Sequence, residues 1–300
     1  MSISQDSGSG GRGSKSRAFT WRGGGSVELH GESFGDPKHQ LVVLLHGGGQ
    51  TRHAWKNLGG SLASVGFHAL ALDARGHGDS DWATDGAYGT EAQIEDVMSL
   101  LVKLGDTHPV LVGASMGGTT SLVAVGRGQI DARALVLIDI APQLERDGVD
   151  RITTFMLATE AGFSSLEEVA EAVAAYQPQR PRPESFEGLF KNVRMGSDGR
   201  YRWHWDPRFL SQQTPMDPEW KQELEGYAER LTLPTLLVRG AMSDVLTESG
   251  ARKFLELCPA AEYANVSGAG HMVAGDRNDA FSDTVRSFLR RVVTPVPDTD

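Results

Sequence analysis

Ser115 is the residue whose surroundings point most clearly to chemistry. It stands in the run Gly113-Ala114-Ser115-Met116-Gly117, directly after the apolar stretch 110–112. This spacing is typical of a sharp strand-to-helix turn, in which bare glycines allow close backbone contact and the serine hydroxyl is presented to a substrate. The pattern predicts a nucleophilic serine.

A serine hydroxyl is too weak an acid to attack without a base that takes its proton. His271, at the end of Gly268-Ala269-Gly270-His271, is the predicted base, because the unperturbed imidazole titrates near neutral pH. The ring also needs a carboxylate that fixes its tautomer. Asp244 and Asp139 both follow predicted strands and are the two candidates for this acid.

The stretches between these residues alternate between buried strands and amphipathic helices. Largely apolar runs at 41–45, 67–72, 110–112, 134–138 and 234–240 are typical of strands that are covered on both faces. Between them lie segments whose apolar residues recur at helical spacing, such as the segment from Thr90 to Leu104. This alternation predicts an α/β fold with a doubly wound, mostly parallel sheet, which an antiparallel hairpin at 18–34 opens.

The alternation stops at Pro142 and resumes near residue 217. The stretch between them holds helical patterns at 151–160 and 165–176 and no buried-strand pattern. We therefore expect a helical cap at 142–216, inserted into a core formed by 18–141 and 217–294, with disordered tails at 1–17 and 295–300. Ligands of open α/β sheets bind at the carboxyl ends of the strands, where this cap would lie.

Several motifs together resemble the α/β-hydrolase fold. They are the serine turn, the chain order Ser115–Asp244–His271, the His46-Gly47-Gly48 run and the loop Asp73-x-Arg75-Gly76-x-Gly78-x-Ser80. The resemblance covers residues 18–292 and is strongest to the branch that holds esterases, cofactor-free haloperoxidases and carbon–carbon bond hydrolases. It implies that no cofactor is needed.

The resemblance also implies roles for further residues. It favours Asp244 over Asp139 as the acid, because the turn after Gly240 is the commoner position for it. It assigns the oxyanion hole to the backbone N–H groups of Gly48 and Met116. Further residues are candidates for the substrate pocket, although the aromatic ones among them could equally pack the cap onto the core. These candidates are Gly47, Phe155, Met156, Trp203, Trp205 and Met272.

Composition narrows the classes of partner. The net charge of −10 argues against a nucleic-acid surface, which needs a basic stripe. No apolar run approaches the roughly 20 residues of a membrane span, and the N-terminal residues lack the apolar segment of a secretory signal. The single cysteine, Cys258, is compatible with a reducing compartment, so we expect a cytoplasmic protein. Neither His46 nor His77 belongs to a known metal-ligand pattern, and we expect no metal.

The predicted function is hydrolysis of a small carboxylic ester through an acyl-enzyme. A carbon–carbon hydrolase of ring-fission dienones is an alternative, and its substrate carboxylate would need cationic cap residues such as Arg180, Arg182, Arg194 or Arg202. Lactonase or perhydrolase activity would use the same residues. A small-molecule receptor on a hydrolase scaffold is the alternative outside enzymes. The substrate and the oligomeric state cannot be predicted from this sequence.

Overall fold

The computed structural model describes residues 16–106, 108–157, 162–176, 186–212, 217–271, 273 and 278–293. Its centre is an eight-stranded sheet in the order β1-β2-β4-β3-β5-β6-β9-β10. The strands are β1 Arg17–Arg22, β2 Glu28–Phe34, β3 Gln40–Leu45, β4 Phe67–Leu72, β5 Val110–Ala114, β6 Ala134–Ile138, β9 Thr235–Gly240 and β10 Glu262–Val266. The strands β4, β3, β5, β6, β9 and β10 run parallel to one another. The strands β1 and β2 form the expected antiparallel hairpin at one edge of the sheet.

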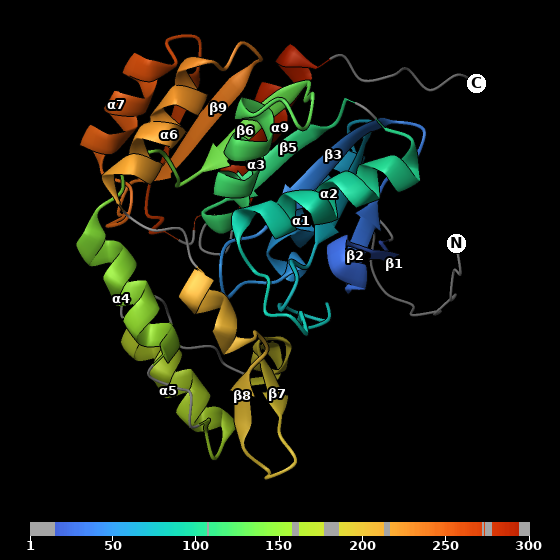
Figure 1. Cartoon of the computed structure of the whole chain (residues 1–300), viewed down its shortest axis with the longest axis vertical. Helices are drawn as coiled ribbons and strands as arrows, with labels where there is room; N and C mark the ends of the chain where they lie inside the picture. The colour runs from blue at the N-terminus through green and yellow to red at the C-terminus, as the bar shows by residue number, and fades with distance from the viewer. Residues whose placement is uncertain are drawn as a thin grey trace.

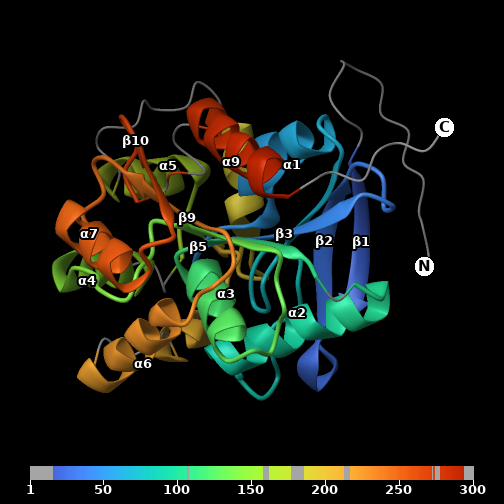
Figure 2. The same cartoon turned by 90° about the horizontal axis from the view of Figure 1, so that it is seen from above.

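Helices cover both faces of the sheet, which confirms the doubly wound prediction. One face carries α1 (Lys56–Ala63) and α9 (Asn278–Val292), and the other carries α2 (Thr90–Leu104), α3 (Met116–Gly126) and α6 (Pro218–Glu229), as Figure 2 shows. A further helix, α7 (Glu248–Leu257), packs beside α6. Each strand supplies alternate residues to the two faces. On β3, Val43 belongs to one apolar cluster and Val42 and Leu44 to the other. Both clusters are buried, so continuous apolar runs form these strands.

Strand register decides which side chains meet at the carboxyl edge. Ala114 at the end of β5 pairs with Ile138 at the end of β6. The residues that follow, Ser115 and Asp139, therefore leave the sheet side by side, and the Ser115 N–H donates to the Ile138 carbonyl at 3.1 Å. Because Ser115 and Asp139 follow neighbouring strand ends, this register bears on which aspartate lies close to the serine.

The insertion lies over that edge, below the sheet in Figure 1. It contains α4 (Arg146–Leu157), α5 (Leu166–Tyr176) and three-residue-per-turn helices at Phe186–Asn192 and Pro207–Gln212. The structure also shows a two-stranded antiparallel sheet, β7 (Val193–Met195) with β8 (Tyr201–Trp203), where only helices were expected. Strands of three residues are too short to produce a readable alternation. Within the described residues, no helix is long and apolar enough to span a membrane.

Candidate active site

Ser115 occupies the sharp turn that its sequence predicts. It lies between β5 and α3 with φ 45° and ψ −112°, a strained combination for a non-glycine residue. A Cβ at Gly113 would lie 2.3 Å from the Gly117 carbonyl oxygen, and one at Gly117 would lie 2.4 Å from the Leu45 carbonyl oxygen. Any larger residue would therefore clash with backbone, which is the physical reason for both glycines.

His271 is paired with Asp139. Its Nδ1 lies 2.7 Å from Oδ2 of Asp139, a carboxylate with no solvent exposure. The same carboxylate accepts the Gly240 N–H through Oδ1 at 2.9 Å and the Ser243 hydroxyl through Oδ2. Three donors thus fix the carboxylate in one orientation, and the carboxylate fixes the imidazole with its proton on Nδ1. The other ring nitrogen, Nε2, is left as the acceptor.

Asp244 does not occupy the place that was predicted for it. Its carboxylate pairs with Nη2 of Arg151 on α4 at 2.5 Å, and its side chain is 36% exposed. In the turn after β9 the side chain of Ser243 faces Asp139, and the next residue, Asp244, points toward the cap instead. The prediction that Asp244 orients His271 is therefore wrong, and the alternative, Asp139, stands beside the ring.

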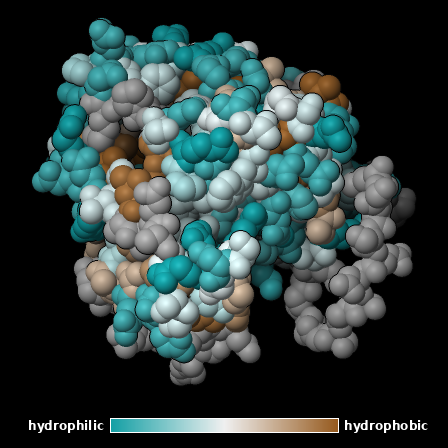
Figure 3. Space-filling view, turned by 60° about the horizontal axis from the view of Figure 1, so that its bottom comes forward, coloured by the Kyte–Doolittle hydropathy of each residue, from teal (hydrophilic) through white to brown (hydrophobic). Residues whose placement is uncertain are grey.

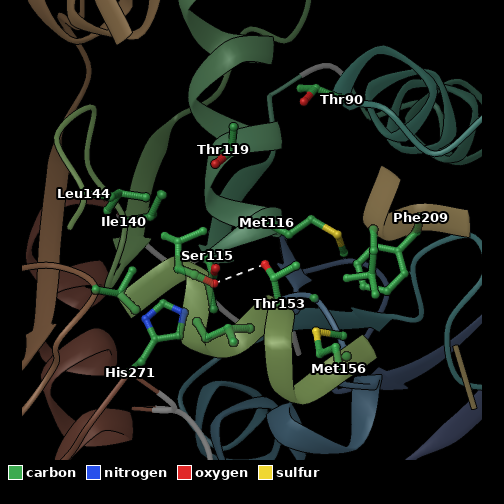
Figure 4. A pocket seen from close by; sticks show the side chains of 18 of the residues that line it. Thr90, Ser115, Met116, Thr119, Ile140, Leu144, Thr153, Met156, Phe209 and His271 are labelled. Carbon is green, nitrogen blue, oxygen red and sulfur yellow. Dashed lines mark hydrogen bonds between the residues drawn. The ribbon is translucent and has the colours of Figure 1, made fainter. Parts of the chain in front are cut away.

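A cavity of about 470 Å³ opens above Ser115 and is lined by Ser115, His271, Gly48 and Met116 together. Figure 4 shows that the imidazole of His271 and the side chain of Ser115 both face this cavity. The neighbouring Gly47 N–H is already used, since it donates to Oε1 of Gln50 at 2.9 Å. Within the described part of the chain, neither the Gly48 N–H nor the Met116 N–H donates to a protein acceptor. Both are thus available to a bound oxygen.

The predicted pocket residues separate into three groups. Gly47, Phe155, Met156 and Trp205 line the cavity. Trp203 does not; it is buried behind the wall and stacks on Trp205 with ring centroids 4.9 Å apart. Met272 lies outside the described residues. The space-filling view shows an apolar recess in an otherwise mostly polar surface (Figure 3).

Comparison with known proteins agrees with this architecture. Residues 40–277 match the family model of the alpha/beta hydrolase fold. The chain belongs to this family. An α/β-hydrolase of Novosphingobium aromaticivorans has the same fold, with a TM-score of 0.78 at 23% identity, over 93% of this chain and 99% of that one.

Two relatives with assigned activities share more of the sequence. An esterase of Mycobacterium tuberculosis is 28% identical over 255 residues, which are 83% of this chain and 82% of the esterase. An sn-1-specific diacylglycerol lipase of Mus musculus is 31% identical over 268 residues, which are 85% of this chain and 82% of the lipase.

Three buried histidines form a cluster that no pattern in the sequence predicted. The rings of His46 and His77 are 5.2 Å apart, and those of His77 and His204 are 5.9 Å apart. Each ring accepts one backbone N–H: His46 that of Ala74, His77 that of Gly49, and His204 that of Gly78. The second nitrogen of each ring therefore carries the proton and donates to a carbonyl. All three rings are neutral.

The histidine cluster joins the cap to the loop that carries Gly48. Nδ1 of His204, a cap residue, accepts the Gly78 N–H at 2.8 Å, and its Nε2 donates to the Gly49 carbonyl at 3.3 Å. His77 holds the N–H of the same Gly49 at 3.1 Å. All six ring nitrogens are used by backbone groups, and among the described residues no group of three His, Cys, Asp or Glu side chains could hold a metal ion.

Burial lowers the pKa of all three rings, that of His204 to about 3 and that of His77 well below its usual value. In the unfolded chain the same rings titrate near 6.5. Below that pH the unfolded state binds protons that the folded state does not, so stability must fall as the pH drops from about 6.5 toward 3. Between pH 7.5 and 5.5, His204 alone should reduce the free energy of unfolding by roughly 1 kcal/mol.

Urea unfolding of the wild type and of His204→Gln at both pH values measures this effect. The variant should be less stable at pH 7.5, but its loss of stability on going to pH 5.5 should be smaller by roughly 1 kcal/mol. An equal loss in the two proteins would show that His204 is not held neutral in the folded state.

Proposed function

We propose that this α/β-hydrolase is a serine esterase that cleaves a small carboxylic ester through an acyl-enzyme. The observation that carries the proposal is the pairing of His271 with buried Asp139 at the same cavity as the strained Ser115. A cavity of about 470 Å³ falls within the usual size range of small-molecule sites. The esterase and the lipase among the relatives support the same class of reaction.

Each residue has a distinct task in this proposal. Nδ1 of His271 donates to Asp139, so its Nε2 takes the proton of Ser115 as the hydroxyl attacks the ester carbonyl. The backbone N–H groups of Gly48 and Met116 stabilise the oxyanion, and each such donor contributes about 3 kcal/mol in other hydrolases. His271 then protonates the departing alcohol. Water attacks the acyl-enzyme by the same route and releases the acid.

The carbon–carbon hydrolase alternative is not supported by the arginines that were predicted for it. Of its four candidate arginines, Arg194 and Arg202 do not line the cavity, and Arg202 is paired with Asp198 at 2.7 Å. Arg180 and Arg182 lie outside the described residues. A substrate carboxylate therefore has no partner in Arg194 or Arg202. The cations that do line the cavity are Arg146 and Lys221, so the dienone in the substrate panel remains a necessary comparison.

A substrate panel tests the proposal. Purified protein is assayed against p-nitrophenyl esters, lactones and a ring-fission dienone, with Ser115→Ala as the blank. We expect ester hydrolysis to have the highest kcat/KM and to vanish in the blank. Cleavage of the dienone alone, or binding of all ligands without turnover, would contradict the proposal and favour the carbon–carbon hydrolase or the receptor.

A further inference from the structure

Two threonine hydroxyls in the cavity wall are not used by the catalytic residues or by the fold. Thr119 belongs to the first turn of α3, and Ser115 is the N-cap residue of that helix, four residues earlier; four helical residues advance about 6 Å. The Thr119 side chain is nine-tenths buried and lines the cavity. Thr90, the first residue of α2, lines the same cavity. The N-cap position of α2 is held by Gly89.

The neighbouring polar groups have partners and these two do not. Within α3, the hydroxyls of Thr120 and Ser121 donate back to carbonyls one turn earlier. The amide of Gln93 donates to the Tyr88 carbonyl and accepts from Thr120. Among the described residues, neither the Thr119 nor the Thr90 hydroxyl has a hydrogen-bond partner. A polar group that faces a cavity unpaired is free to bind a ligand.

Two larger polar side chains near the threonines, Tyr88 and Gln212, are also engaged. Tyr88 donates to Asp206 and accepts the Ala83 N–H. Gln212 accepts the Tyr88 N–H and donates to the Gly86 carbonyl. These bonds hold both side chains in place. A third donor of the cavity that is unpaired among the described residues, Nε1 of Trp220, comes from α6.

The position of the threonines indicates which part of an ester they would meet. The bond between Thr120 and Gln93 holds the first turns of α2 and α3 together, so Thr90 and Thr119 lie on one wall. Figure 4 shows this wall on the opposite side of Ser115 from His271. His271 must reach the departing alcohol in order to protonate it, so the alcohol lies on the side of His271. The acyl arm then extends toward the threonines.

We propose that Thr119 and Thr90 bind an oxygen atom carried by the acyl chain, so that the preferred substrates are esters of oxygenated acids rather than of plain fatty acids. This inference rests on the proposed esterase function. An extended chain advances about 1.2 Å per bond, so 6 Å corresponds to an oxygen four or five bonds from the scissile carbonyl. Both hydroxyls can donate to an ether, hydroxyl or carbonyl oxygen at that place.

The test compares two esters that differ in one atom. They are p-nitrophenyl hexanoate and p-nitrophenyl 5-oxahexanoate, in which an ether oxygen replaces one methylene. The measured quantity is the ratio of kcat/KM for the oxygenated ester to that for the plain ester. Thr119→Val removes the hydroxyl at nearly constant volume and should reduce this ratio about three- to tenfold. Thr90→Val should reduce it in the same direction, and Thr119→Ser should restore it.

Thr153→Val is the matched control. Thr153 lines the same cavity, but its hydroxyl already donates to the Val149 carbonyl at 3.1 Å, so the ratio should stay within twofold of the wild type. An unchanged ratio in Thr119→Val, with both esters still hydrolysed, would overturn the inference alone. Failure of the wild type to hydrolyse either ester would count against the esterase function itself.

Discussion

Replacing Asp139 by asparagine is expected to reduce kcat/KM for ester hydrolysis by about 10⁴-fold, whereas Asp244→Asn should change it less than about threefold. The carboxylate of Asp139 accepts the Nδ1 proton of His271 at 2.7 Å. An asparagine amide can rotate to donate to Nδ1 instead, which moves the ring proton to Nε2 and removes the base that Ser115 needs. Steady-state kinetics on p-nitrophenyl butanoate measures both variants.

The two aspartates make a matched pair, because both stand at strand ends of the same sheet edge. Asp244 is bound to Arg151 in a partly exposed ion pair, which contributes at most about 1 kcal/mol to stability. Thermal unfolding of both variants controls for loss of the fold. A large loss of activity in Asp244→Asn together with an active Asp139→Asn would return the acid to Asp244.

Ser115→Ala is expected to lower kcat by about 10⁵- to 10⁶-fold, the loss seen when a serine nucleophile is removed in other hydrolases. Alanine keeps the Cβ and leaves Gly113 and Gly117 in place, so the turn between β5 and α3 should persist. Ser121→Ala, on the same helix, is the control: its hydroxyl donates to the Gly117 carbonyl and is buried away from the cavity, and kcat should stay within about tenfold. Hydrolysis by Ser115→Ala at the wild-type rate would exclude Ser115 as the nucleophile.

The sequence predicted those parts of the site that depend on local backbone. The glycines two positions before and after Ser115 indicate a turn in which a Cβ at either glycine would lie within 2.4 Å of a backbone atom. Such a local constraint can be predicted from five consecutive residues. The central strands could also be predicted, because a strand covered on both faces is mostly apolar. His271 was predicted as the base from its place in the loop after the last strand.

The choice between Asp139 and Asp244 could not be read from local pattern. Both residues follow strands, and the decision depends on how the turn after β9 directs successive side chains: Ser243 toward Asp139, and Asp244 toward Arg151. The pairing of Ala114 with Ile138 also brings Asp139 out of the sheet next to Ser115. Strand order and register are long-range properties, and the sequence pattern does not state them.

The cap was the least predictable part for the same reason. Trp203 and Trp205 are two positions apart, yet only Trp205 reaches the cavity, because the cap packs the first ring behind the second. His204 between them is bound to Gly49 and Gly78, more than 120 residues earlier in the chain. Contacts at such separations depend on how the cap docks, and no spacing within the cap encodes them.

The central claim is that Ser115 forms a covalent bond to its substrate with help from His271 and Asp139. Reaction with a fluorophosphonate, followed by mass spectrometry of the digested protein, tests it most directly. We expect one adduct per chain on the peptide that contains Ser115, none in Ser115→Ala, and much slower labelling in Asp139→Asn than in Asp244→Asn. Stoichiometric labelling of a different residue, or unmodified Ser115 in a sample whose esterase activity has been lost to the reagent, would contradict it.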